Sequence, residues 1–228
     1  MASPNTEHRP TTAAIEDYAK AVYALQERTG CAVTTTAVAE RLGVTPGSAS
    51  AMLKRLGELG HVVHSPYRGV ELTPAGVRVA LEVIRHHRLL ELYLVQELGM
   101  PWDRVHAEAE VLEHVISEEL EALIAAKLGE PDTDPHGDPI PSAALELAEP
   151  ATQPLDALDS GARGRFVRVS DADPAMLRYL SARGVAPGDE FEVVERQPFG
   201  GPLFVRFGAG DEVHVLGGEL AASMRVQA

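Results

Sequence analysis

The sequence ERLGVTPGSASAMLKRL, at residues 40–56, holds two short helical patterns separated by a tight turn. Residues 36–42 favour a short helix that Gly43 ends. Thr45-Pro46 then predicts the start of another, because threonine is a good N-cap and proline fits the first helical position. The stretch therefore predicts a helix-turn-helix.

The second helix, residues 46–56, has one apolar and one polar face. We expect it to bury Ala49, Met52, Leu53 and Leu56. Its outer face carries small polar side chains followed by a Lys-Arg pair, which suits a helix that enters the major groove and touches phosphate with its later turns. The residues expected to contact DNA are Thr45, Pro46, Ser48, Ser50, Lys54 and Arg55.

Both flanks of this motif extend the same unit. Residues 12–26 place Ile15, Ala19, Val22 and Leu25 on one face of an amphipathic helix. Residues 61–73, HVVHSPYRGVELT, alternate around a Ser-Pro-Tyr-Arg-Gly turn, which predicts a two-stranded wing with Arg68 near its tip as a further phosphate contact. The alternative is a winged helix used for protein contact.

Residues 105–128 predict one long helix, and Glu110, Glu113 and His114 project from its neighbouring turns. We expect Val105, Ala109, Leu112, Ile116, Leu120 and Leu123 to form its buried stripe. Upstream, His87 and Glu91 are also four residues apart, and His106 lies one turn before Glu110. These residue types suit a metal site, although the same spacing also occurs on solvated charged faces. No HExxH motif is present, so the usual zinc-hydrolase pattern is missing.

The rest of the chain predicts further elements in order. A helix from Pro74 to Leu98 and the one over residues 105–128 have apolar faces too large for one helical hairpin, which favours a symmetric dimer. The Pro-rich residues 129–164 predict an ordered strip and then a flexible linker. Short strands and glycine turns after Val167 predict a small β-barrel.

We therefore expect a mainly α fold with β structure. The expected domains are a winged helix-turn-helix at residues 1–73, a helical metal-binding and dimerisation domain at 74–142, a linker at 143–163, and a small barrel of the Src-homology-three kind at 164–228.

Composition limits the class of protein. The 228 residues carry a net charge of −14, but residues 1–75 hold seven basic and seven acidic residues, so the excess acid lies in the remainder. A neutral N-terminal unit permits DNA binding, and a bound divalent cation would offset part of the acidic charge. The absence of a long apolar run or a secretory signal predicts a cytoplasmic protein without a membrane partner. The single Cys31 excludes an internal disulfide and a CxxC-type zinc site.

Five motifs in this order resemble the diphtheria-toxin-repressor family of metal-dependent transcriptional repressors, in its three-domain form. The motifs are AIEDYAKAVYAL, ERLGVTPGSASAMLKRL, IRHHRLLELYL, VHAEAEVLEHVISEELE and HGDPIP. Together they span nearly the whole chain, so the resemblance implies a homodimer that binds a pseudo-palindromic operator.

The resemblance also implies two metal sites. The primary, activating site of the family would fall on Asp17, Glu110, Glu113 and His114. An ancillary site would fall on His87, Glu91 and His106, completed from the third domain by Asp171, with Asp173 as the alternative.

The ligand types indicate which metal is used. The resemblance implies that iron-responding members of the family have Met and Cys at the positions of Asp17 and Glu110. Manganese-responding members have carboxylates at both positions, as this chain does. Oxygen ligands with one imidazole suit Mn²⁺, and soft sulfur donors suit later metals. Lys20 stands where compact manganese members have another acidic ligand, so their two-metal cluster is not expected.

We therefore expect a Mn(II)-activated repressor of metal-homeostasis genes, with an Fe(II)-dependent repressor of iron-uptake genes as the alternative. A metallohydrolase is the competing class. The Glu/His set leaves no separate general base or nucleophile, so we expect no catalytic residues and no small organic substrate.

Overall fold

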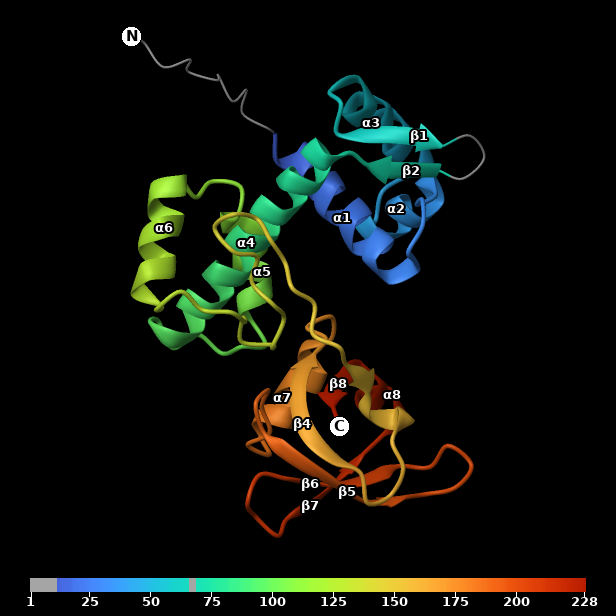
Figure 1. Ribbon diagram of the computed structural model, residues 1–228, viewed down its shortest axis with the longest axis vertical. Helices are drawn as coiled ribbons and strands as arrows, with labels where there is room; N and C mark the ends of the chain where they lie inside the picture. Colours follow the sequence, from blue (N-terminus) through green and yellow to red (C-terminus); the bar gives the residue numbers. More distant parts are fainter. Residues whose placement is uncertain (1–11, 66–68) are drawn as a thin grey trace. The chain divides into compact units, whose positions relative to one another are not determined.

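The computed structural model describes residues 12–65 and 69–228 (Figure 1). The chain divides into two compact units. The first comprises the chain up to Arg85 together with Ala143–Leu145, and the second comprises His86–Ser142 and Glu146–Ala228. Among the described residues, no helix is long and apolar enough to cross a membrane.

Three helices begin the first unit, close to the predicted positions: α1 (Ala13–Thr29), α2 (Thr35–Leu42) and α3 (Pro46–Glu58). Gly43 ends α2 in the left-handed region, at φ 63°. Thr45 then caps α3, because its Oγ1 accepts the backbone N–H of Ser48 at 3.1 Å. The helices pack on one apolar core, formed by Ile15, Tyr18, Val22, Leu25, Val33, Val38, Ala39, Ala49, Leu53, Leu56, Val62 and Val70.

The predicted wing is present as the antiparallel strands β1 (Val62–Ser65) and β2 (Gly69–Leu72). Residues 66–68 at its tip, and so the contact expected from Arg68, lie outside the described residues. Gly69 lets the wing approach the segment before α2, because a Cβ there would lie 2.0 Å from the carbonyl oxygen of Val33. Its φ of 115° also favours glycine.

Helix α4 (Pro74–Gln96) follows the wing, and its residues from His86 onward belong to the second unit. There α5 (Val105–Leu112) and α6 (Glu118–Lys127) take the place of the single helix predicted over residues 105–128. The prediction was wrong because Ser117 is extended, at φ −89° and ψ 154°, and its side chain caps α6 by accepting the N–H of Leu120.

This break shifts the buried face of the second helix. Leu120 and Leu123, expected in the buried stripe, are 49% and 62% exposed in the single chain, whereas Ile124 and Ala125 are buried. The helical core of the second unit consists of Leu89, Leu90, Leu92, Ala109, Ile124, Ala125 and Ile140.

The C-terminal part of the second unit is a six-stranded antiparallel sheet with the order β3-β8-β4-β5-β6-β7 (Figure 1). Its elements are β3 (Gln153–Pro154), the 3-10 helix η1 (Leu155–Ala157), β4 (Arg163–Val169), α7 (Pro174–Ser181), β5 (Glu190–Arg196), β6 (Leu203–Phe207), β7 (Val213–Leu216), α8 (Gly218–Ser223) and β8 (Met224–Gln227). Part of the expected linker is structured, since β3 pairs with β8 and Leu155 is fully buried in the barrel core.

A Pro-rich strip, residues 131–142, follows α6 and docks on β4. The backbone N–H of Val169 donates to the carbonyl oxygen of His136 at 3.0 Å. Gly137 makes this approach possible, because a Cβ would lie 1.9 Å from the carbonyl oxygen of Val167 and because its φ is 87°. The strip therefore connects the helices of the second unit to its barrel.

Candidate metal centre

Four residues that the family resemblance assigned to the ancillary site lie together within the second unit. His87 and Glu91 occupy one face of α4, His106 lies in the first turn of α5, and Asp171 follows β4. One nitrogen or oxygen atom from each of the four lies within 4.8 Å of the others. Three separate segments thus meet at one point.

The contacts among these side chains are short. Nε2 of His87 lies 3.0 Å from Glu91 Oε1 and 3.1 Å from Nδ1 of His106. Nδ1 of His106 lies 2.9 Å from Asp171 Oδ2 and 3.4 Å from Glu91 Oε1. Glu91 is 1% exposed, so its charge is withdrawn from water.

The imidazoles stabilise the charged form of both carboxylates. Burial alone would raise the pKa of Glu91, but hydrogen bonds with His106 and His87 and the nearby imidazole of His136 outweigh burial and lower that pKa. Burial would also raise the pKa of Asp171, but the contact with His106 outweighs burial and lowers that pKa. Contacts with Asp171, which has the larger effect, and with Glu91 raise the pKa of His106 to about 10.

This donor set fits a divalent cation. Two imidazole nitrogens and two ionised carboxylates converge, and they supply the nitrogen and oxygen ligands that Mn²⁺, Fe²⁺ and Zn²⁺ accept. A cation would take the place of the extra proton that the raised pKa gives His106, which exchanges one source of positive charge for another.

The alternative ligand, Asp173, has a different local role. It caps α7, where its Oδ1 accepts the backbone N–H of Ala175 at 2.8 Å. Asp171, two residues earlier, is the aspartate that contacts His106.

The residues assigned to the primary site differ in their surroundings. Glu113 is fully buried and ends α5, His114 follows it, and Glu110 is 42% exposed. Oε1 of Glu113 lies 3.5 Å from Nε2 of His114. Asp17 lies on α1 in the first unit, where it is partly buried.

Two neighbouring histidines of α4 hold Glu113 in place. Nδ1 of His86 lies 3.1 Å from the backbone oxygen of Glu113, and its Nε2 lies 3.1 Å from Glu121 on α6. Nδ1 of His87 donates to Oε2 of the Glu113 side chain. Glu113 is thus positioned by its backbone and its side chain where α5 ends.

Asp134 and His136 in the Pro-rich strip were missed as candidate ligands. They group with Glu91, and all three are buried. Nε2 of His136 lies 2.9 Å from the carbonyl oxygen of Trp102. Its buried Nδ1 has no hydrogen-bond partner among the residues that the structure describes, and it lies 3.7 Å from Glu91 Oε2, too far for a hydrogen bond.

The electrostatics of this second group differ from those of the first. Burial, with the charges of Asp138 and Glu91, raises the pKa of Asp134 to about 8. Burial would lower the pKa of His136, but the nearby carboxylate of Glu91 outweighs burial and raises that pKa to about 9. The Asp-Pro-His spacing of the HGDPIP region was the available signal, but proximity to Glu91 is a tertiary feature.

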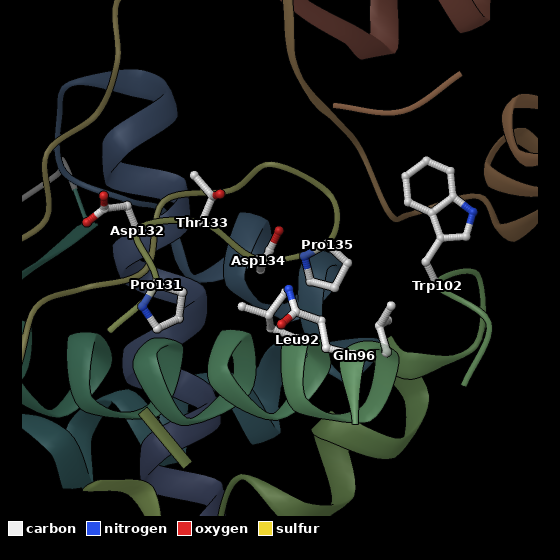
Figure 2. A pocket seen from close by; sticks show the side chains of 9 residues that line it. Leu92, Gln96, Trp102, Pro131, Asp132, Thr133, Asp134 and Pro135 are labelled. Carbon is white, nitrogen blue, oxygen red and sulfur yellow. The ribbon is translucent and has the colours of Figure 1, made fainter. Parts of the chain in front are cut away.

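A pocket of about 450 Å³ lies beside this group, between α4 and the strip (Figure 2). Pro131–Pro135 line one side, Leu92 and Gln96 of α4 line another, and Trp102 closes one end. Asp134 belongs both to the pocket wall and to the Glu91 group, so the pocket adjoins the metal-competent residues.

The helix-turn-helix presents the polar face predicted for it. Thr45, Pro46, Ser48, Ser50, Lys54 and Arg55 are all exposed on or beside α3. The Ser48 hydroxyl lies 2.9 Å from the Thr45 hydroxyl and so belongs to the helix cap. Leu53 and Leu56 on the opposite face are fully buried.

Known proteins resemble the chain over almost its full length. The iron-dependent repressor IdeR of Mycobacterium tuberculosis is 31% identical, and the match covers 93% of this chain and 96% of that protein. The chain belongs to the iron-dependent repressor family. The diphtheria toxin repressor of Corynebacterium efficiens is 31% identical over 80% of this chain and 83% of its own.

Three family models match the repressor in sequence order. They are the iron-dependent repressor N-terminal DNA-binding domain at residues 10–70, the metal-binding and dimerisation domain at 73–142, and the FeoA domain at 153–228. The chain is thus a metal-dependent transcriptional repressor with a three-domain fold, and the family is not one of enzymes.

Solved structures of repressors show the same fold. A manganese-dependent transcriptional repressor in complex with manganese matches with a TM-score of 0.85 and 43% identity, over 94% of this chain and 99% of that one.

Membership in the family also implies DNA and a second copy of the chain as partners. The second unit exposes apolar side chains on and beside α5 and α6, namely Val111, Val115, Leu120 and Leu123. Leucines that a lone chain leaves in water at helix faces are typical of a dimer interface. The buried stripe predicted from the sequence is therefore split between the core and this exposed face.

Proposed function

We propose that this repressor is activated by Mn²⁺, which binds a primary site made by Asp17, Glu110, Glu113 and His114. The observation that carries the proposal is the donor set, three carboxylates with one imidazole and no sulfur, because hard oxygen ligands suit Mn²⁺. The 43% identical manganese-dependent repressor supports it.

Metal at this set would change DNA binding by joining two parts of the chain. Asp17 belongs to the DNA-binding unit, and the other three residues belong to the second unit. Three carboxylates repel one another without a cation, so the bound metal favours the arrangement in which they converge. That difference in free energy couples metal to the operator-binding conformation.

The second set, His87, Glu91, His106 and Asp171, would hold an ancillary ion. All four belong to the second unit, so this ion stabilises the union of α4, α5 and the barrel. His136 offers an additional nitrogen toward Glu91. We propose the domain division 1–73, 74–142, 143–163 and 164–228 for these roles.

The proposed partner is a pseudo-palindromic operator contacted by two copies of α3 and of the wing. Thr45, Pro46, Ser48, Ser50, Lys54, Arg55 and Arg68 would make the contacts, and the regulated genes would serve metal homeostasis. Operator affinity measured by fluorescence anisotropy with Mn²⁺, Fe²⁺ or chelator, without oxygen, tests the proposal on the promoter of a metal transporter. Equal affinity with Mn²⁺ and with chelator would refute it.

Fe²⁺ is the second candidate. Of the two similar proteins named above, IdeR and the diphtheria toxin repressor, IdeR is an iron-dependent repressor. The same anaerobic titration separates the two metals. If operator binding requires a lower free concentration of Fe²⁺ than of Mn²⁺, iron is the activating metal.

A further inference from the structure

His87 touches both proposed metal-binding sets, one with each ring nitrogen. Its Nε2 faces Glu91 and His106, at 3.0 and 3.1 Å. Its Nδ1 faces the other way and donates to Oε2 of Glu113. The side chain is 7% exposed, so packing holds the ring in this orientation.

Glu113 divides its two oxygens in the same manner. Oε2 accepts from His87, and Oε1 lies 3.5 Å from Nε2 of His114. Glu91 and His106 therefore lie on one side of the His87 ring, and the Glu113 carboxylate and His114 lie on the other. We expect Oε1, the oxygen nearer His114, to be the one that binds a primary-site cation.

The chemistry of imidazole makes this arrangement directional. A neutral ring has one protonated nitrogen, so a ring that binds a metal through Nε2 must carry its proton on Nδ1. That N–H then points at Glu113 and fixes its carboxylate. Carboxylates that accept from metal-bound histidines orient the ring and are oriented by it.

We propose that His87 serves both sites, as an ancillary ligand through Nε2 and as a positioning residue for Glu113 of the primary site through Nδ1–H. The inference rests on the proposed function and adds a role to a residue that the sequence placed in one site only. His106, its neighbour, contacts Glu91 and Asp171, and its Nε2 lies 3.8 Å from Oε1 of the primary-site residue Glu110.

Three variants separate the two roles. His106→Ala removes an ancillary ligand and leaves the His87–Glu113 contact intact. His87→Asn places an amide N–H near the position of Nδ1 but has nothing at the position of Nε2. His87→Gln places its amide near the position of Nε2 and loses the donor to Glu113. We expect each variant to lose the ancillary ion, so that the primary site is measured alone.

Binding is measured without DNA, from the loss of the electron paramagnetic resonance signal of free Mn²⁺. We expect the wild-type chain to bind two ions and each variant to bind one. The remaining ion should bind His106→Ala and His87→Asn with similar affinity, and His87→Gln roughly 10-fold more weakly, which is the usual effect of losing a group that orients a ligand. Thermal unfolding in chelator serves as the control for folding.

Two outcomes would overturn this inference alone. If His87→Gln bound its ion as tightly as His106→Ala, the contact with Glu113 would have no positioning role. If His87→Asn were as weak as His87→Gln, the N–H at the Nδ1 position would not be the cause. A wild-type chain that bound no Mn²⁺ would overturn the proposed function as well.

A second measurement covers variants that fail to fold. In the wild-type chain loaded with diamagnetic Zn²⁺, ¹⁵N spectra of labelled histidine should show His87 with metal at Nε2 and a proton at Nδ1. The opposite pattern would contradict the inference.

Discussion

Glu91 shows how a single buried carboxylate organises a metal-competent site. It contacts His87 and His106, lies near His136, and is withdrawn from water, so its lowered pKa depends on positive charge supplied around it. A cation bound between these residues would supply that charge more compactly than separate protons do. The carboxylate is thus ionised before the metal arrives.

Asp17→Ala tests the proposed union of the two units. The variant loses one partly buried carboxylate, so the fold should persist, but metal-dependent operator affinity should fall by about 100-fold because the coupling is lost. Anisotropy with and without Mn²⁺ measures it. Glu16→Ala, one residue away on α1, is the control and should keep the response. Unchanged operator affinity in Asp17→Ala would contradict the proposed coupling.

The double variant Asp17→Met, Glu110→Cys tests metal choice. It replaces two hard oxygen donors with a thioether and a thiol that ionises on meeting a metal, so activation should shift from Mn²⁺ toward Fe²⁺ or Co²⁺. Anaerobic titrations of operator binding with each metal give the ranking. An unchanged ranking would show that ligand softness does not set the selectivity.

At the scale of elements, local signals predicted the DNA-binding unit well. Thr45-Pro46 and Gly43 act through neighbouring backbone atoms, so their effect is visible in the sequence. The break before α6 was missed because the apolar spacing of residues 105–128 continues through it, although Ser117 is a good N-cap. The approach of Asp134 and His136 to Glu91 depends on tertiary packing and has no local signal.

The candidate sites also differ in how far the sequence could predict them. The structure brings together His87, Glu91, His106 and Asp171, which the resemblance had named. The contact of His87 with Glu113 was not foreseen, because it joins α4 to the end of α5, where the predicted helix was thought to continue.

Lys54→Ala tests the role of α3. Lys54 is exposed and only 4.0 Å from Glu58, a surface pair of little value to stability, so the variant should fold normally. Losing one phosphate contact should reduce the slope of log affinity against log salt by about one, equally for all DNA sequences. Lys127→Ala on α6 is the control. An unchanged slope in Lys54→Ala would place this side chain away from phosphate.

Gly137→Ala tests the docking of the strip on β4. The new Cβ would overlap the carbonyl oxygen of Val167 and force a residue with a side chain to adopt φ 87°. We expect a loss of at least about 2 kcal/mol in the free energy of unfolding, typical of strain combined with lost contacts. Urea unfolding followed by circular dichroism measures it. Gly217→Ala, with φ −67° and open space around it, should cost far less.

The whole molecule is expected to work as a dimer, and we propose that the exposed apolar residues of α5 and α6 form its interface. Leu123→Glu puts a charge on the open face of α6, where the side chain is 62% exposed, so the single chain should fold but the dimer should dissociate. Sedimentation velocity measures the mass. Val194→Glu, at an exposed apolar position on β5 of the barrel, should remain dimeric. A dimeric Leu123→Glu variant would place the interface elsewhere.

The contact between the strip and β4 combines a main-chain hydrogen bond with the Arg168–Asp138 ion pair, and the main-chain part affects how the protein can evolve. A hydrogen bond from the N–H of Val169 to a carbonyl oxygen does not depend on which side chain residue 169 carries. Substitutions at Val169 that keep the barrel core can therefore preserve this hydrogen bond. Gly137 has no room for a side chain at this contact, so in descendants of this repressor we expect the glycine to persist while surface residues of the barrel away from the strip vary.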